Sequence, residues 1–497
     1  MMIIGTILIS IYILALVLIF FYALAQLNLL INYISYKKKH KNLPKPDLSV
    51  FKTLPYVTIQ LPLYNEKYVV ERLLKNIAKV EYPRNRLEIQ VLDDSTDESI
   101  EITEKIIHQL QNEGLDIKHI KRKERKNFKA GALKEGLKTA KGEFIAIFDA
   151  DFLPQKEWLT LTLPYFIDKN IGAVQTRWGH INKDYSLLTK VQAFALDLHF
   201  TLEQVGRNSK KHFINFNGTA GIWRKECILD AGNWQGDTLT EDLDLSYRAQ
   251  LKKWSIHYLE EVVTPAELPV VISAARSQQF RWNKGGAENF RKMIKNVYSA
   301  KHLPLTTKLH ASFHLLNSSV FFSVFVIALL SIPVLYFNSR YFEFNYIFYL
   351  MSFFLISTLI FFTCYWVAYK KVNSVGFTSF FRFIGLFFSF FSIAMGFSWN
   401  NTLAILEGHM GKKSDFIRTP KFNVNTITDK WKGNAYISSK LTHNTFIEGL
   451  LVLYFAFGLF WAFTNDHFLN NLSMIAFHLM LFAGFSYVFF NSIFSRA

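Results

Sequence analysis

Two carboxylates one residue apart end an apolar run in this sequence. Asp149 and Asp151 follow the run 144–148 directly, and Pro154 comes soon after. Such a pair can hold a divalent cation that bridges a diphosphate, because Mg2+ and Mn2+ prefer carboxylates together with phosphate oxygens. An ordinary turn or helix cap uses the same residue types. The pair alone therefore leaves both interpretations open.

Two further acidic groups follow other predicted elements. Asp93 ends a predicted strand and can accept a hydrogen bond from a nucleotide base or ribose, although a strand running into the N-cap Asp97 has the same pattern. Asp242 stands in Thr240-Glu241-Asp242 and can act as a general base that deprotonates a hydroxyl. A capping Thr followed by first-turn acids is its structural alternative.

A basic and aromatic motif comes next, with Gln278, Arg281 and Trp282 in Gln-Gln-Phe-Arg-Trp. Arg281 can donate a charged hydrogen bond to a diphosphate, and Trp282 offers a flat apolar face to a sugar ring. An amphipathic basic helix on a membrane surface is the alternative. Each motif has such an alternative, so their order along one domain is the stronger evidence.

The elements that must position these motifs have the pattern of an α/β domain. Apolar, β-rich runs alternate with helical patterns, and the resulting fold is a mainly parallel sheet with right-handed crossovers. The strands are predicted at 57–61, 87–92, 144–148, 172–176 and 256–259, and the early helices at 66–79, 97–111 and 129–139. The first three strands end in polar residues, beginning with Tyr64 and Glu66. Because the carboxyl ends of parallel strands meet at one edge, a single crevice is expected there.

Composition favours a membrane protein over a nucleic-acid binder. The 497 residues are 50% apolar, include 49 Phe and carry a net charge of +17, and a soluble basic domain rarely exposes so much Phe and Leu. The basic residues lie mainly at membrane borders, so we expect no nucleic-acid partner. Cys227 and Cys364 are the only cysteines, which makes a disulfide framework improbable and excludes a cysteine-based zinc site.

Five membrane crossings are predicted, with the basic flanks in the cytosol. They lie at 3–31, 311–337, 346–369, 446–463 and 472–494. Basic residues flank the apolar block 377–406 on both sides, so we interpret it as interfacial or re-entrant. The expected parts are an N-terminal transmembrane helix at 1–36, a basic linker at 37–53, a cytosolic domain at 54–300 and a membrane domain at 301–497. The plasma or inner membrane is the expected location.

Together, these motifs resemble the processive branch of glycosyltransferase family 2, which includes cellulose, chitin and hyaluronan synthases. The likeness is greatest to the cellulose-synthase-like mannan and glucan synthases, on the segments 90–97, 129–136, 146–152, 216–223 and 278–282. It covers about 57 to 293 and weakens in the membrane segments. The resemblance implies a nucleotide-sugar-binding domain of the GT-A type, inserted between transmembrane helices.

The resemblance also implies residue roles. Asp242 would be the base of an inverting transfer, and Asp149 and Asp151 would bind the metal, Mg2+ or Mn2+. The nucleoside and diphosphate would contact these two acids together with Tyr64, Glu66, Asp93, Lys129, Gln278 and Arg281. The acceptor would contact Phe216, Asn217, Gly218, Thr219, Glu241 and Trp282.

A segment at about 408–425 resembles the gating loop of cellulose synthases, Phe-x-Val-Thr-x-Lys, through Phe416, Thr419 and Lys421. Two residues depart from that family: Arg418 replaces the usual Val, and Asn217 stands where cellulose synthases carry Cys. Close identity with cellulose synthase is therefore doubtful. We see no domain for binding a cyclic dinucleotide and expect no such regulation.

The expected activity is polymerisation of a β-linked, β-1,4 polysaccharide from UDP-glucose or GDP-mannose, with export through the protein's own channel. The expected partners are the nucleotide sugar, the growing polysaccharide and the lipid bilayer, with accessory or export proteins as further candidates. One alternative is addition of a single sugar to a membrane lipid, as ceramide glucosyltransferases do. Another is a non-catalytic transporter or scaffold with structural acids.

Overall fold

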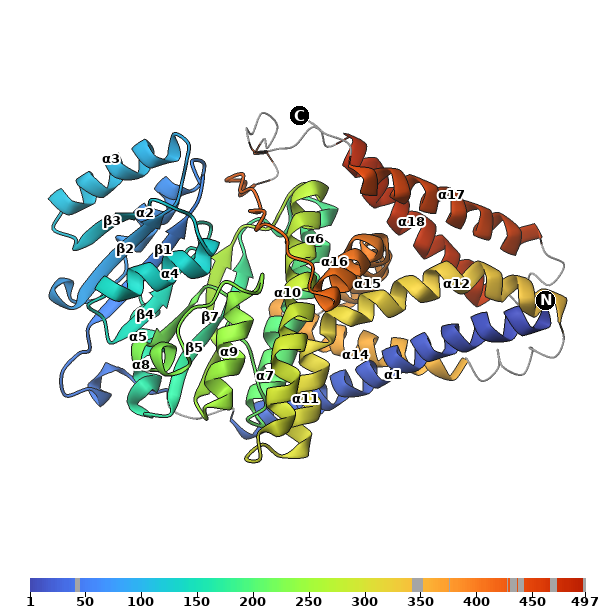
Figure 1. The fold of residues 1–497 in the computed structure, drawn as a ribbon, viewed down its shortest axis with the longest axis horizontal. Coiled ribbons are helices and arrows are strands. Elements are labelled where there is room, and N and C mark those ends of the chain that lie inside the picture. Colours follow the sequence, from blue (N-terminus) through green and yellow to red (C-terminus); the bar gives the residue numbers. More distant parts are fainter. Residues whose placement is uncertain are drawn as a thin grey trace.

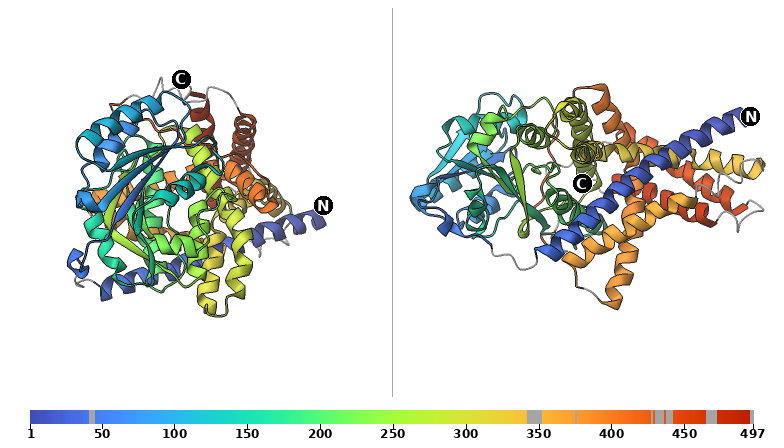
Figure 2. Two further views of the ribbon diagram at one scale, coloured as in Figure 1. Left: turned by 60° about the vertical axis from the view of Figure 1, so that its left-hand side comes forward. Right: turned by 90° about the horizontal axis from the view of Figure 1, so that it is seen from below.

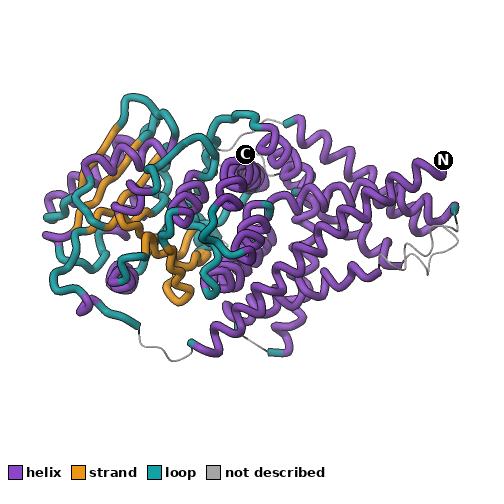
Figure 3. Tube along the Cα trace, turned by 60° about the horizontal axis from the view of Figure 1, so that its bottom comes forward, coloured by secondary structure: helices purple, strands orange, loops and turns teal. Residues whose placement is uncertain are grey.

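The computed structural model describes residues 1–40, 45–341, 352–374, 376–426, 428–429, 436, 442–464 and 472–494. Strands gather at one end of the molecule and long helices at the other (Figures 1 and 3). The N-terminus lies at the tip of the helical end, far from the sheet. The structure therefore has a strand-rich region and a region of long helices, while the expected domain bounds stay predictions.

A seven-stranded mixed sheet, ordered β3-β2-β1-β4-β6-β5-β7, forms the α/β part. The strands β3, β2, β1 and β4 are parallel to one another, β6 is antiparallel to β4 and β5, and β5 is parallel to β7. This confirms the mainly parallel sheet. The strands are β1 Val57–Leu63, β2 Leu87–Asp93, β3 Ile117–Lys121, β4 Phe144–Ile147, β5 Ile171–His180, β6 Gly221–Arg224 and β7 Ser255–Ala266.

Two strands were not predicted. β3 lies at the sheet edge and reads Ile-Lys-His-Ile-Lys, so only its first residue is fully buried. β6 has four residues, Gly-Ile-Trp-Arg, which is too short for a period to be recognised. By contrast, β2 and β4 are buried along their whole length, as expected for parallel strands covered on both faces.

Helices cover both faces of the sheet. On one face, α2 (Val70–Ile77), α3 (Ser99–Asn112) and α5 (Trp158–Thr162) pack into one apolar cluster, while α4 (Phe128–Thr139), α6 (Leu187–Leu198), α8 (Lys225–Asp230) and α9 (Glu241–Leu251) pack into another. The second cluster continues into the helical end through α1, α14 and α15. One continuous apolar core thus joins the sheet to the long helices.

The helical end contains α1 Met2–Lys39, α12 Val320–Arg340, α14 Leu355–Val372, α15 Phe377–Gly396, α17 His443–Thr464 and α18 Leu472–Phe494. Helices α1 and α12 run side by side (Figure 2). Between the two ends lie α7 Gln204–Asn208, α10 Ile272–Ser299, α11 Leu305–Leu315 and α16 Ser398–Met410. Helix α10 therefore contacts both the sheet domain and the bundle.

Five helices of the described chain are long and apolar enough to cross a membrane: 2–39, 317–337, 377–396, 443–464 and 475–494. This supports the multi-pass arrangement; the orientation and the specific membrane stay predictions. The set differs from the expected crossings, because α15 is included and α14 is not. The first residues of the span expected at 346–369 lie outside the described residues. The interfacial placement of 377–406 also stays a prediction.

Candidate functional site

A cavity of about 180 Å³ opens at the carboxyl ends of β1 and β4, facing α9 and α10. Most of the predicted site residues line it, although they come from distant parts of the sequence. They are Tyr64, Glu66, Lys129, Asp149, Asp151, Asn217, Gly218, Glu241, Asp242, Gln278, Arg281, Trp282, Phe416, Thr419 and Lys421. The expected crevice at the strand ends is therefore present.

Asp149 and Asp151 are each paired with a lysine. The Lys129 ammonium donates to Asp149 Oδ1 at 2.5 Å and to the Gly218 carbonyl at 2.9 Å. The Lys421 ammonium donates to Asp151 Oδ2 at 2.7 Å. Burial lowers the pKa of Lys129, but the carboxylates of Asp149, Glu241 and Asp242 together outweigh burial and raise it overall. Each of the two carboxylates is therefore already paired with a lysine ammonium group.

The same pair fits a divalent cation by its donor chemistry. Two carboxylates at one cavity wall supply hard oxygen ligands, which Mg2+ and Mn2+ supplement with phosphate oxygens and water. Within the described residues, no cluster of three or more His, Cys, Asp or Glu could hold a metal. The described residues alone therefore offer too few ligands here for a closed cage, which suits an ion that arrives with a phosphate.

Asp242 lies in the first turn of α9, next to the Gly218 backbone. A Cβ atom built on Gly218 would lie 3.1 Å from Asp242 Oδ2. Burial and the neighbouring Glu241 carboxylate raise the pKa of Asp242 to about 7. Burial also raises the pKa of Glu241. A carboxylate whose pKa lies near the working pH is suited to accept a proton.

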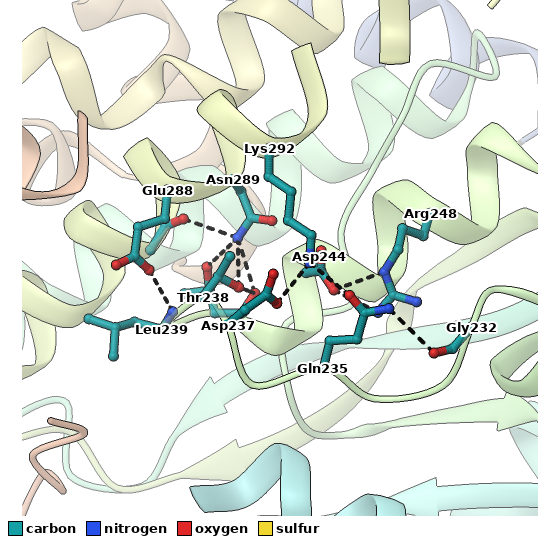
Figure 4. A network of polar contacts seen from close by, with 12 residues as sticks. Gly232, Gln235, Asp237, Thr238, Leu239, Asp244, Arg248, Glu288, Asn289 and Lys292 are labelled. Carbon is teal, nitrogen blue, oxygen red and sulfur yellow. Dashed lines mark hydrogen bonds and ion pairs between the residues drawn. The ribbon is translucent and has the colours of Figure 1, made fainter. Parts of the chain in front are cut away.

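The loop before Asp242 is fixed by α10, as Figure 4 shows. Asn289 donates to the Thr240 hydroxyl at 2.9 Å and to the Thr240 carbonyl at 3.2 Å. Glu288 accepts from the Leu239 amide at 2.7 Å, and Lys292 pairs with Asp237 at 2.8 Å. The Thr240 side chain does not cap α9. The capping hydrogen bond of the structural alternative is therefore absent, although Glu241 and Asp242 do lie in the first turn of α9, and the Thr240 hydroxyl anchors the loop to α10.

Arg281 and Trp282 project from the same helix into the cavity. The Arg281 guanidinium lies 4.5 Å from the centroid of the Phe416 ring, a cation–π contact. Gly285, one turn further along α10, lies against the Thr240 side chain, because a Cβ there would meet Thr240 Oγ1 at 2.5 Å. Helix α10 therefore sets the distance between Arg281 and the Thr240-Glu241-Asp242 motif.

The segment 412–425 crosses the cavity without regular structure. Phe416 stacks on Phe128 with ring centroids 5.6 Å apart. Arg418 pairs with Glu66 at 2.7 Å, so the residue that departs from cellulose synthases has a partner in the site. Burial raises the pKa of Glu66 to about 7, although Arg418 acts in the opposite direction. With Lys421 on Asp151, this segment is tied to two acids of the cavity.

Three predicted site residues lie behind the wall. Asp93 accepts from His119 at 2.9 Å and from the Ser95 amide at 2.9 Å. Burial raises its pKa, but these hydrogen bonds outweigh burial and leave it below the usual value. Phe216 is fully buried and packs against the Trp223 ring, and Thr219 is also buried. All three support the wall and do not line the cavity.

Other residues on the cavity wall were not predicted. Asp94 lines it in place of Asp93 and accepts from Arg122 at 2.8 Å. Arg125 lines it as well, 3.4 Å from the centroid of the Tyr64 ring. Glu267 accepts from the Phe422 amide at 2.7 Å. The sequence pair Asp93-Asp94 could have indicated Asp94 as a site residue. No motif in the sequence marks Arg125 or Glu267.

Comparison with known proteins agrees with this geometry. Residues 55–285 match the protein family described as "Glycosyltransferase like family 2". The chain is 40% identical over 280 residues to glucomannan 4-beta-mannosyltransferase 1 of Cyamopsis tetragonoloba, covering 55% of this chain and 53% of the relative. It is 41% identical over 261 residues to glucomannan 4-beta-mannosyltransferase 9 of Arabidopsis thaliana, covering 52% and 49%. The chain thus spans about half the length of the curated relatives it matches.

Among solved structures, the fold is similar to that of the mannosyltransferase PcManGT from Pyrobaculum calidifontis, determined in complex with GDP-Man and Mn2+. The TM-score is 0.53 at 18% sequence identity, covering 82% of this chain and 100% of that one. At this identity the likeness concerns the fold, and it confirms the predicted GT-A-like architecture.

Proposed function

Because residues 55–285 match the family described as "Glycosyltransferase like family 2", we propose that the chain belongs to this family and transfers sugar from a nucleotide donor to the end of a β-1,4-linked polysaccharide. The observation that carries the proposal is the convergence of Asp149, Asp151, Asp242 and Arg281 on one cavity. Acids for a metal, a base and a cation for a diphosphate are the groups that such a transfer needs.

In the proposed reaction, Asp242 accepts the proton of an acceptor hydroxyl. The hydroxyl oxygen attacks the anomeric carbon of the donor sugar as the bond to the diphosphate oxygen breaks, so the configuration inverts. Arg281 takes up the charge that develops on the departing nucleoside diphosphate. Because Asp242 has a pKa near 7, it can hold this proton and release it to solvent afterwards.

Asp149 and Asp151 are the proposed ligands of Mg2+ or Mn2+. When bound, the ion supplies positive charge to the diphosphate. Lys129 and Lys421, which pair with the two acids at 2.5 and 2.7 Å, lie where they can turn from the carboxylates to phosphate oxygens. Tyr64 and Glu66, which line the cavity, are further proposed contacts of the nucleotide, as is Gln278, which precedes Arg281 on α10.

We propose GDP-mannose as the donor, since the curated relatives are named mannosyltransferases and PcManGT was determined with GDP-Man. UDP-glucose is the competing donor. A polymer is favoured over a single sugar on a lipid because the named relatives act on glucomannan. Export of the chain between the five apolar helices belongs to the same proposal, since a polysaccharide is too polar to cross lipid unaided.

The test uses membranes that contain the full chain. Labelled GDP-mannose or UDP-glucose is supplied with Mg2+ or Mn2+, and the product is sized and digested with an endo-β-mannanase. We expect a mannanase-sensitive polymer that disappears on chelation of the metal. A solvent-extractable glycolipid as the product would contradict the proposed polymer synthesis. The absence of any sugar transfer would contradict the proposed enzymatic activity.

Asp242→Asn should abolish transfer while GDP binding persists, because the amide cannot accept the proton. The matched control is Asp230→Asn, which removes an exposed ion pair with Lys252 outside the cavity and should leave the rate unchanged. Full activity of Asp242→Asn would remove this residue from the role of base.

A further inference from the structure

A single π-helical turn, His199–Glu203, interrupts the helical run between α6 and α7. Such turns are rare and occur frequently at functional sites. This turn places the side chains of His199 and Glu203 behind Asn217, and Asn217 lines the cavity beside Gly218. His199 Nδ1 lies 2.9 Å from Glu203 Oε2, and His199 Nε2 lies 3.1 Å from Asn217 Nδ2.

Neighbouring groups define the direction of each hydrogen bond. The Gln204 amide nitrogen donates to the Asn215 carbonyl at 3.0 Å and to Asn217 Oδ1 at 2.7 Å. Asn217 Nδ2 must then face His199, and since an amide nitrogen can only donate, His199 Nε2 is the acceptor. The remaining ring hydrogen is on Nδ1 and is donated to Glu203.

Glu203 is suited to receive that hydrogen. Burial raises its pKa, but Arg207 and His199 outweigh burial and hold the pKa well below the usual value. It therefore stays a carboxylate, which accepts from the Nδ1–H group and fixes the tautomer of the ring. Gln26 of α1 also donates to Glu203, at 2.5 Å, so the first helix contributes to the same support.

The Asn217 side chain is consequently held by both of its ends. One N–H is donated to His199, and one lone pair of Oδ1 accepts from Gln204. An amide has two N–H groups and two lone pairs, so one donor and one acceptor are left for a group in the cavity. Gly218, the next residue, lies against Asp242. The free amide functions are therefore close to the proposed base.

We propose that His199 is a positioning residue of the acceptor subsite, which holds the Asn217 amide so that its free donor and acceptor bind a hydroxyl of the acceptor sugar. This inference rests on the proposed glycosyl transfer and adds a determinant of acceptor binding to it. The Asn217 side chain would contact the sugar, whereas His199 would act through Asn217.

The experiment compares His199→Asn with His199→Gln, which carry the same amide group on side chains of different length. A Gln carbonyl can replace Nε2 and accept from Asn217, while the shorter Asn side chain can contact Glu203 but does not reach Asn217. With GDP-mannose as donor and β-1,4-mannohexaose as acceptor, we expect His199→Asn to raise the acceptor KM about tenfold, the effect of losing one hydrogen bond at a buried polar group. The donor KM should not change. His199→Gln should restore most of the acceptor KM.

His212→Phe is the control, since His212 bonds to Thr307 and does not contact Asn217. It should leave the acceptor KM unchanged. GDP binding reports whether each variant is folded, and if His199→Asn does not fold, His199→Phe supplies a ring that packs on Phe200 as His199 does but lacks the acceptor nitrogen.

An unchanged acceptor KM in His199→Asn, or equal losses in His199→Asn and His199→Gln, would overturn the inference. A purely structural role would raise both KM values or lower stability alone, and this too would overturn it. Failure of the wild-type protein to transfer mannose would instead overturn the proposed function. The two failures are therefore distinguishable.

Discussion

Gly218→Ala tests whether the cavity wall and the base are in contact. Gly218 has a φ angle of +81°, and a Cβ atom added to it would lie 3.1 Å from Asp242 Oδ2. The left-handed backbone costs an alanine about 1–2 kcal/mol of stability. The methyl group would also push the carboxylate by a few tenths of an ångström, and a misplaced base lowers kcat by roughly 10- to 100-fold.

Gly114→Ala is the matched control for the backbone strain. Gly114 has a φ of +83°, and a Cβ there meets nothing within 4 Å. Both variants should therefore lose similar stability in thermal unfolding, but only Gly218→Ala should lose kcat in mannosyl transfer from GDP-mannose. If Gly218→Ala keeps the wild-type kcat at the same loss of stability, Asp242 does not lie against Gly218 in the working enzyme.

Two further predictions concern the base and the loop that carries it. Since the pKa of Asp242 is raised to about 7 and a base must be ionised, kcat/KM should fall as pH drops below about 7 and level off above it; a flat profile across neutrality would contradict this. Asn289→Ala removes the bonds to Thr240 and should lower kcat about tenfold with an unchanged donor KM. A raised donor KM at full kcat would place Asn289 in nucleotide binding instead.

Burial explains which strands could be predicted from the sequence. β4 is apolar throughout, and β1 and β2 are rich in buried Val, Ile and Leu because helices cover both faces of the sheet, so their sequences identify them. β3 has the sequence Ile-Lys-His-Ile-Lys and lies at an edge, and β6 is identified by its partners β4 and β5 more than by its four residues. Local pattern cannot reveal an element whose stability comes from pairing with strands distant in the chain.

Prediction from local sequence has the same limit for single residues of the candidate site. Asp149, Asp151, Asp242 and Arg281 belong to motifs with a recognisable order, and they do line one cavity. The contact between His199 and Asn217 has no such signal, since a lone His on a helix is more often structural. The choice between Asp93 and Asp94 depended on which side of β2 faces the crevice, and that is set by its neighbours in the sheet.

Helix α10 connects the proposed chemistry to the membrane helices. Toward the cavity it presents Arg281 and anchors the loop of Asp242 through Asn289. On its other side Arg276 donates to buried Glu448 of α17 at 2.7 Å. Removing one partner of a buried ion pair leaves an uncompensated charge, which is strongly destabilising, so α10 and α17 are held in one arrangement. The proposed base and the proposed diphosphate contact therefore keep their spacing by being fixed to the same helix that the bundle holds.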